Sequence, residues 1–194
     1  MDLKGEYWDT FYSEDHSPGW DIGYVSTPIK DYIDQLTDKN VKILIPGAGN
    51  AYEAEYLKEK GFNNVYVMDW STQAIGSFIK RYPGFPSENI LTEDFFEHKG
   101  NYDLVIEQTF FCAIHPSERQ MYAKKVFDLL KPGGKLVGLL FDDALFDNKP
   151  PYGGSREEYE NYFKPYFSFK VYETSYNSIK PRAGRELFIN FVKK

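Results

Sequence analysis

The stretch VKILIPGAGNAYEAEYL, residues 41–57, begins as a strand and ends as a helix. Gly47 and Gly49 stand at the junction, where no bulky side chain is present. Glycine lets the backbone approach a ligand closely and permits positive φ, and ligands of doubly wound sheets bind at the carboxyl ends of the strands. A tight turn is the alternative, because 15 glycines in 194 residues produce such pairs by chance.

Strands and helices alternate along most of the remaining chain. Helices are expected at residues 27–36, 51–60, 71–81, 117–130 and 157–164, and strands at 41–45, 65–68, 90–91, 104–106 and 135–141. This alternation predicts an α/β fold with parallel strands and right-handed crossovers. The segments YFSFKVYETSYN and ELFINFVKK carry a strand-like alternation rich in β-branched and aromatic residues, so an antiparallel pair is expected to close the sheet edge.

Length and composition predict a single domain over residues 1–194, with 42% hydrophobic residues available for a core. The formal net charge of -6 argues against a nucleic-acid partner, which favours a basic face. One cysteine, Cys112, permits no internal disulfide and indicates a reducing compartment. We expect no signal peptide, no membrane-spanning helix and no metal site, so the predicted location is cytoplasmic.

Two acids follow successive predicted strands. Asp69 lies about twenty residues after Gly49, where a nucleotide-type ligand offers its ribose hydroxyls. Asp94 follows the third strand beside an apolar residue, an arrangement that suits an adenine edge and face. A helix N-cap is the alternative for each acid, and Ser71 makes capping a real competitor for Asp69.

The glycine pattern also indicates which nucleoside ligand is expected. A dinucleotide site prefers a third glycine in G-x-G-x-x-G, and Tyr52 occupies that place. No Gly-Lys-Ser/Thr of a phosphate-binding loop follows. A nucleoside without phosphates fits better, and S-adenosylmethionine is such a ligand.

Several motifs together resemble a known family. They are ILIPGAGNAYEAEYL, VYVMDWS, TEDFF, FFCAIHPSERQMYAKKVFDLLKPGGKLVGLLF and PPYGG, with SPGWDIG near the N-terminus. From about Tyr7 to Phe191 the chain resembles class I S-adenosylmethionine-dependent methyltransferases. More narrowly, it resembles the thiopurine S-methyltransferase superfamily and, within it, the plant thiol/halide methyltransferases.

The resemblance implies a Rossmann-like, seven-stranded, mostly parallel sheet with helices on both faces and an antiparallel C-terminal strand. Within the single domain, residues 1–36 would cover cofactor and substrate, and residues 41–141 would form the cofactor-binding core. Residues 142–194 would supply a lid loop, expected at 142–156, and the C-terminal antiparallel strands. The lid is expected from the loop's own composition, because an acidic segment that contains proline and glycine is expected to be mobile.

The resemblance also implies a set of cofactor-binding residues: Trp8, Tyr12, Trp20, Gly47, Gly49, Glu53, Asp69, Trp70, Asp94, Phe95 and Glu107. Trp8 and Trp20 would cover the cofactor, whose sulfonium is attracted to an aromatic face, and Tyr12 replaces a third family tryptophan. Glu53 matches an acid near the methionine amino group, with an exposed first-turn acid as the alternative.

Candidates for the acceptor pocket are Gln108, Tyr152 and His115. Glu107 and Gln108 are expected at the methyl end, and the family often has an aromatic residue where Gln108 stands. Tyr152 belongs to the PPY of the thiol/halide branch. His115 could take a proton from a thiol, but it precedes Pro116 at a helix start, which favours a structural or capping role.

The expected reaction is in-line methyl transfer to a small-molecule acceptor, most simply a thiol or halide. A thiol is already partly ionised at neutral pH and a halide needs no base, so no catalytic residue is certain. Cys112 is expected to be a small buried hydrophobe. Two alternatives remain: an NAD-dependent oxidoreductase, which Tyr52 argues against, and a nucleoside-binding module without turnover. The expected assembly is a monomer or weak dimer.

Overall fold

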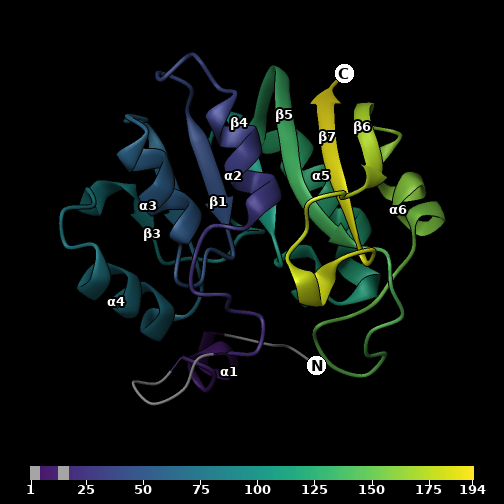
Figure 1. Cartoon of the computed structure of the whole chain (residues 1–194), viewed down its shortest axis with the longest axis horizontal. Coiled ribbons are helices and arrows are strands. Elements are labelled where there is room, and N and C mark those ends of the chain that lie inside the picture. Colours follow the sequence, from purple (N-terminus) through teal and green to yellow (C-terminus); the bar gives the residue numbers. More distant parts are fainter. Residues whose placement is uncertain (1–4, 13–17) are drawn as a thin grey trace.

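The computed structural model describes residues 5–12 and 18–194, and within them the strands form one seven-stranded sheet (Figure 1). The strands are β1 (Ile43–Pro46), β2 (Val65–Met68), β3 (Ile90–Leu91), β4 (Tyr102–Gln108), β5 (Leu130–Phe141), β6 (Phe167–Thr174) and β7 (Glu186–Lys193). Their order across the sheet is β3-β2-β1-β4-β5-β7-β6. Pairs among β1 to β5 are parallel, whereas β7 is antiparallel to both β5 and β6. The predicted fold class is therefore confirmed.

The helices flank this sheet. They are α1 (Gly5–Asp9), α2 (Thr27–Asp34), α3 (Tyr52–Glu59), α4 (Thr72–Arg81), α5 (Arg119–Leu129) and α6 (Arg156–Phe163), with short 3-10 turns η1 (Ser87–Asn89), η2 (Phe111–Ala113), η3 (Pro116–Glu118) and η4 (Lys180–Arg182). Figure 1 shows α2 and α3 in front of the sheet and α5 behind it. Within the described residues, no helix combines the length and apolar character needed to cross a bilayer.

The buried side chains form two clusters, one on each face of the sheet. One cluster joins Ile33 of α2 and Leu57 of α3 to Ile45 of β1, and the other joins Val126 of α5 and Phe163 of α6 to the opposite face. Parallel strands covered on both faces must be apolar along their whole length. The burial of all four β1 residues has this cause.

Two elements differ most from the prediction. The helix expected at 117–130 is divided into the 3-10 turn η3, which begins at Pro116, and the α-helix α5. Strand β5 begins at Leu130 rather than Lys135 and includes Pro132, Gly133 and Gly134. A register shift against β4, between Tyr102 and Leu104, accommodates this irregular start.

Candidate active site

A cavity of about 720 Å³ lies at the edge of the sheet where the parallel strands end. Its lining follows β1 at residues 47–50, β2 at 69–70, β3 at 93–96 and β4 at 109–110 and 112–115. The order of strands reverses at β1, which has β2 on one side and β4 on the other. The cavity therefore lies at the topological switch point, where open α/β sheets bind their ligands.

The glycines after β1 form a close backbone turn in this cavity. Gly47 has φ 58° and Gly49 has φ 53°, a left-handed conformation that side chains other than glycine adopt at a cost. A Cβ at Gly47 would overlap the ring of Phe110, and one at Gly49 would lie 2.7 Å from the Tyr12 hydroxyl. Both the conformation and the space therefore require glycine, which leaves bare backbone facing the cavity.

Asp69 is held against this glycine turn. Its Oδ2 accepts a hydrogen bond from the Gly49 N–H at 2.7 Å, and its Oδ1 accepts one from the Ser71 N–H at 2.8 Å. The cap of α4 is Ser71, whose Oγ accepts from the Ala74 N–H at 3.0 Å. Ser71, and not Asp69, is therefore the N-cap of α4. Burial raises the pKa of Asp69, and the backbone donors oppose that rise. Each carboxylate oxygen keeps a second acceptor position for a hydroxyl.

Asp94 and Phe95 line the cavity from the segment that follows β3, the strand next to β2. Asp94 Oδ1 accepts from the Phe96 N–H at 2.8 Å, which fixes the carboxylate at the cavity edge. The ring of Phe95 is buried and packs 5.2 Å from the ring of Phe110. The structure thus places Asp94 and Phe95 together at the cavity, and their contact with an adenine stays a prediction.

Aromatic residues from the N-terminal part of the chain cover the cavity. Trp8, Tyr12 and Trp20 all line it, and the Trp20 Nε1–H donates to the Tyr12 hydroxyl at 3.2 Å. The rings of Trp8 and Trp20 are 6.0 Å apart and nearly perpendicular. Trp70 also lines the cavity. Of the expected covering segment 1–36, residues 1–4 and 13–17 lie outside the described residues, as does the first residue of SPGWDIG.

The Asp9 carboxylate holds this aromatic cover against the start of α4. Asp9 was not among the residues predicted from the sequence. Asp9 Oδ1 accepts from the Ser71 hydroxyl at 2.6 Å and from the Gln73 N–H at 3.1 Å. Asp9 Oδ2 accepts from the Thr72 hydroxyl at 3.3 Å. A carboxylate at the N-terminus of α4 is also favoured by the helix dipole. Asp9 therefore ties α1 to the turn that follows Asp69.

A pair of acids lies beside the start of α3. Glu53 is only 6% exposed, so the alternative of an exposed first-turn acid is wrong. Burial raises its pKa to about 7, against the backbone donors of Glu53 and Ser26. Asp21, which sequence reasoning missed although it belongs to the SPGWDIG motif, also lines the cavity. It accepts from the Asn50 side-chain amide and, at 3.3 Å, from the Tyr52 hydroxyl. Two carboxylates here favour a cationic group.

Glu107 does not line the cavity, in contrast to its expected place at the methyl end. Its Oε1 accepts from the N–H groups of Phe110 and Phe111, both at 2.8 Å, and its Oε2 accepts from the Tyr122 hydroxyl. Successive residues of a strand face opposite sides, so Gln108 lines the cavity while Glu107 faces α5. Glu107 instead fixes the turn that carries Phe110 over Gly47.

Gln108 and His115 reach the cavity as predicted, whereas Tyr152 does not. Gln108 Oε1 accepts from the Ser26 hydroxyl at 3.0 Å. His115 caps η3, with its Nδ1 accepting from the Ser117 N–H at 3.3 Å. Tyr152 is buried and lies behind His115, with ring centroids 5.3 Å apart.

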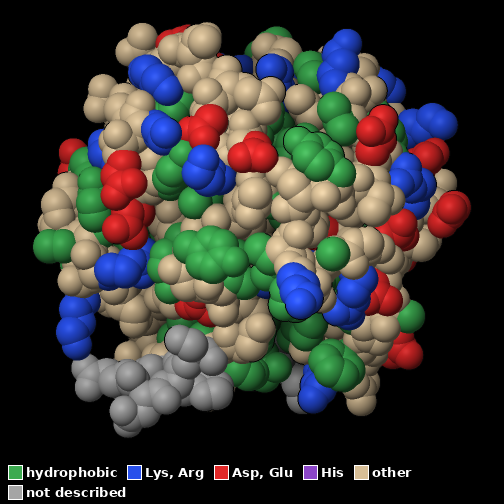
Figure 2. Space-filling model, in the orientation of Figure 1, with side chains coloured by type: hydrophobic (Ala, Val, Ile, Leu, Met, Phe, Trp, Pro, Cys, Tyr) green, Lys and Arg blue, Asp and Glu red, His purple; other side chains and the backbone are tan. Residues whose placement is uncertain are grey.

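Basic side chains line a further wall of the cavity, formed by η4 and the loop after β5. Arg182, Arg185 and Lys149 belong to this wall, and Figure 2 shows Lys and Arg side chains gathered over η4. The Arg182 guanidinium donates to the Trp20 carbonyl at 2.7 Å. No sequence pattern drew attention to these cations, because two segments far apart in the sequence, the loop after β5 and the connection between β6 and β7, bring them to the cavity.

Cys112 lies at the floor of the cavity and behaves as predicted. Its thiol donates to the Thr109 carbonyl at 3.2 Å, and burial raises the pKa of the thiol to about 12. A thiol with this pKa stays protonated at neutral pH, so it is a poor nucleophile. Within the described residues, no group of three or more His, Cys, Asp or Glu side chains could hold a metal ion.

The strand order and the position of the cavity define the class I methyltransferase architecture. Solved structures agree in fold. The structure described as "Conversion of a Disulfide Bond into a Thioacetal Group during Echinomycin Biosynthesis" has a TM-score of 0.77 at 18% identity, covering 98% of this chain and 93% of that one. Magnesium protoporphyrin IX methyltransferase from Synechocystis PCC 6803, with bound SAM, has a TM-score of 0.69 at 15% identity, covering 86% and 77%.

Sequence comparison places the chain more narrowly. The family model for thiopurine S-methyltransferase matches residues 3–189. A probable thiol methyltransferase 2 from Arabidopsis thaliana is 31% identical, over 92% of this chain and 81% of that protein. Thiocyanate methyltransferase 1 from Brassica oleracea is 29% identical over the same shares. The chain belongs to the thiopurine S-methyltransferase family, and it is an S-adenosylmethionine-dependent methyltransferase that acts on a small molecule.

Proposed function

We propose that the acceptor is a small anionic nucleophile, a thiolate or a halide-like ion, and that it takes the methyl group by in-line displacement. The basic side chains of the cavity carry this proposal: Arg182, Arg185 and Lys149 all line it. His115 lies in the same cavity, with its Nδ1 2.8 Å from the Ser117 hydroxyl oxygen and 3.3 Å from the Ser117 backbone nitrogen. Its Nε2 can donate a hydrogen bond to an anion in the tautomer that carries the proton there. A nucleophile that is already anionic needs no base to remove a proton.

The electrostatics of the cavity support the same acceptor. Arg182, Arg185 and Lys149 line the wall formed by η4 and the loop after β5. Arg182 is buried with the Glu186 carboxylate 3.4 Å from its guanidinium, whereas Arg185, which pairs with Asp143, and Lys149 are exposed. Cations beside a cavity attract an anion more strongly where the cavity is shielded from water. The relatives named for thiol and thiocyanate methylation have acceptors of this kind. A hydroxyl or amine acceptor would gain nothing comparable from this wall.

The residues of the other walls fit S-adenosylmethionine. We propose that the backbone at Gly47 and Gly49 meets its methionine part, with Glu53 and Asp21 facing the ammonium group. Asp69 would accept from the two ribose hydroxyls, for which its free lone pairs are suited. Trp8, Tyr12, Trp20 and Trp70 would cover the ligand, and Asp94 with Phe95 would hold the adenine.

The bound cofactor supplies an electrophilic methyl group on a sulfonium. The chain contributes orientation and exclusion of water: the aromatic cover closes one side, and Phe110 with Gln108 borders the strand end. Alignment of two reactants in a near-attack geometry can supply roughly 7–11 kcal/mol. The positive charge disappears during transfer, so the acids are better placed around the ammonium and sugar than at the sulfonium itself.

A turnover assay tests the proposal. The purified protein is incubated with S-adenosylmethionine and, separately, with iodide, thiocyanate, bisulfide, an aryl thiol, a phenol and an amine. We expect methylated product from at least one sulfur or halide acceptor, and product from neither the phenol nor the amine. Binding of S-adenosylhomocysteine without methylation of any sulfur or halide acceptor would contradict the proposed acceptor and leave the nucleoside-binding alternative.

The predictions about assembly, cellular compartment and partners also belong to this proposal. We propose a monomer or weak dimer in a reducing compartment such as the cytoplasm, without nucleic-acid or membrane partners. The acidic net charge of -6 and the single buried cysteine support it. Sedimentation equilibrium over a range of protein concentrations measures the assembly directly.

A further inference from the structure

Arg119, the first residue of α5, is completely buried. Its guanidinium lies beside two aromatic rings that also contact each other, 4.8 Å from the centroid of Phe111 and 5.6 Å from that of Tyr159. Burial of a charge is costly unless the charge is paired and hydrogen-bonded. The partners of this guanidinium therefore indicate what offsets the cost of burying its charge.

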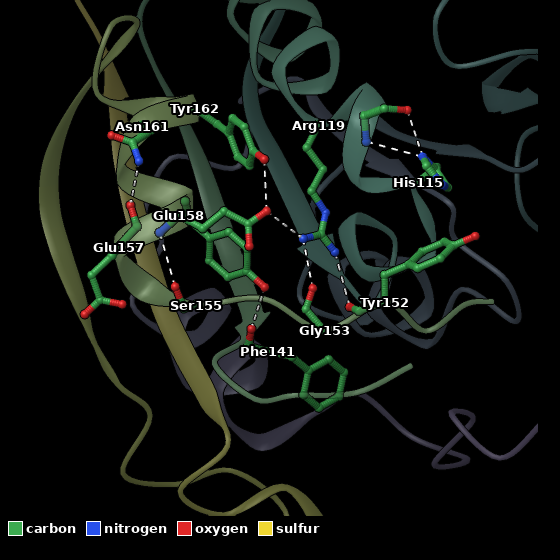
Figure 3. A network of polar contacts seen from close by, with 12 residues as sticks. His115, Arg119, Phe141, Tyr152, Gly153, Ser155, Glu157, Glu158, Asn161 and Tyr162 are labelled. Atoms are coloured by element: carbon green, nitrogen blue, oxygen red, sulfur yellow. Dashed lines mark hydrogen bonds and ion pairs between the residues drawn. The ribbon is translucent and has the colours of Figure 1, made fainter. Parts of the chain in front are cut away.

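Those partners are mostly backbone carbonyls of one loop segment (Figure 3). Arg119 Nη1 donates to the Gly153 carbonyl at 2.9 Å and to the Glu158 carboxylate at 3.2 Å, and Nη2 donates to the Tyr152 carbonyl at 3.2 Å. The segment around Tyr152 contributes only isolated bridges to regular structure, namely Asp143 with Gly154 and Phe146 with Tyr152. Its carbonyls need donors from elsewhere, and one planar fork supplies two of them.

The same segment joins two parts of the cavity wall. Pro150 and Pro151, immediately before Tyr152, line the cavity, as do Cys112 and His115 on the opposite strand-end segment. The Tyr152 N–H donates to the Cys112 carbonyl at 2.6 Å, and the Tyr152 ring packs against His115. The carbonyl of Tyr152 is thus fixed by Arg119 while its N–H is fixed by the 111–115 turn.

We propose that Arg119 is a positioning residue for the acceptor: its guanidinium fork holds the 150–153 segment at a set distance from His115 and so fixes the acceptor side of the cavity. This inference rests on the proposed function of that side. The contacts of Arg119 lie at residues 111 and 152–159, whereas the glycine turn, Asp69 and the aromatic cover are held by other hydrogen bonds. Loss of the fork should therefore affect acceptor binding and spare cofactor binding.

Two substitutions separate the fork from the charge. R119K keeps a cation but has no planar fork, so it can satisfy only one carbonyl well. R119M keeps apolar volume beside the rings of Phe111 and Tyr159 and removes every side-chain donor. The Glu158 carboxylate, which loses its partner, is 35% exposed and can be hydrated. The matched control is K124M, which removes an exposed cation paired with Asp128 on the same helix.

For each variant, four quantities are measured: the melting temperature, the Kd for S-adenosylhomocysteine, the KM and kcat for the best acceptor, and amide hydrogen exchange across residues 142–156. We expect R119M to raise the acceptor KM at least about tenfold and to lower kcat/KM by about a hundredfold, because small misplacements of a reacting group are costly. The R119K values should lie between those of R119M and the parent. In R119M the Kd for S-adenosylhomocysteine should stay within about twofold of the parent value, and amide exchange at residues 152–154 should rise. K124M should change none of these quantities.

Two results would overturn the proposal. One is R119M with unchanged acceptor KM and unchanged exchange at residues 152–154. The other is R119M whose cofactor Kd worsens as much as its acceptor KM, which indicates general loss of structure; R119K, which preserves the charge, repeats that comparison if R119M does not fold. If the parent methylates no acceptor, the proposed function has failed, and the exchange and Kd measurements still decide whether Arg119 fixes this wall independently of the cofactor side.

Discussion

The Gly49 N–H donates to Asp69 Oδ2 at 2.7 Å, so the glycine turn after β1 and the acid after β2 form one unit. The two residues come from adjacent parallel strands and face the same cavity. D69A removes both the acceptor for the Gly49 N–H and the proposed acceptor for the ribose hydroxyls. Lost hydrogen bonds to a charged group are worth about 1.5–3 kcal/mol, so we expect S-adenosylhomocysteine to bind roughly 10- to 100-fold more weakly in isothermal titration calorimetry. Unchanged affinity in folded D69A would refute the assignment of the sugar to Asp69.

Gly49 and Gly61 give a matched pair for the glycine turn. Both have positive φ, but a Cβ at Gly49 would lie 2.7 Å from the Tyr12 hydroxyl, whereas one at Gly61 would meet nothing within 4 Å. We expect G49A and G61A each to lose about 1 kcal/mol of folding stability from backbone strain. Only G49A should also weaken cofactor binding, because the clash displaces the cover. Equal binding by the two variants, measured by the same titration, would show that the Tyr12 contact is unimportant.

Asp9 is expected to hold the aromatic cover closed. D9A removes the acceptor for the Ser71 hydroxyl and the Gln73 N–H, a capping-type contact worth about 1 kcal/mol. We expect the dissociation rate of S-adenosylhomocysteine to rise about fivefold, and the association rate to change little. Stopped-flow tryptophan fluorescence can follow this, since Trp8 and Trp20 line the cavity. D128A, at an exposed ion pair on α5, serves as the control. An unchanged dissociation rate in D9A would mean that the cover does not depend on this contact.

Glu53 predicts a pH dependence of cofactor binding. Burial raises the pKa of Glu53 to about 7 in the free protein, with Asp21 adding to the rise and Arg182 opposing it. A bound ammonium group lowers that pKa, so binding releases a proton and must strengthen as pH rises through about 7. We expect the affinity for S-adenosylhomocysteine to fall as pH is lowered from 8 to 6, with proton release visible in buffers of different ionisation enthalpy. E53Q should bind more weakly and lose this slope; a slope that persists in E53Q would assign the proton to another group.

Cys112 is expected to take no part in the reaction. Burial raises the pKa of its thiol to about 12, and the proposed reaction passes through no enzyme-bound sulfur. C112A should therefore keep kcat within about twofold and lose roughly 1 kcal/mol or less of stability, since only one buried sulfur is removed. Alkylation of the folded parent by iodoacetamide should be slow. A large loss of kcat in C112A would require a different chemistry.

The sequence predicted that the proposed cofactor residues after β1 and β2 meet at one edge of the sheet, because the signals for this placement are local. Gly47 and Gly49 follow an apolar strand directly, and Asp69 follows the next one, so periodicity and turn chemistry place all three at one sheet edge. The error at Glu107 has an equally local cause. Glu107 and Gln108 are neighbours on β4 and therefore point to opposite faces, so both could not border the same cavity.

The parts that sequence reasoning missed depend on contacts between distant segments. Asp9 meets Ser71 across 62 positions, and Arg182 meets the Trp20 carbonyl across 162. A single charged residue in an irregular segment carries no period that marks its partner. Arg119 is a similar case. A charged first residue of a helix is expected at the surface, yet α6 and the loop before it bury Arg119.

The placement of β7 between β5 and β6 has a consequence for partial unfolding. Within the described residues β6 pairs with β7 alone, so separation of β7 from β5 would also release β6 from the sheet. The connection between β6 and β7 contains η4 and Arg182. Sub-global opening of such a unit requires less energy than complete unfolding, and it would remove Arg182 from the cavity wall while β1, β2 and β4 kept the glycine turn and Asp69 together. On the proposed assignment of the walls, such opening would weaken binding of the acceptor and leave the cofactor contacts of Gly49 and Asp69 in place.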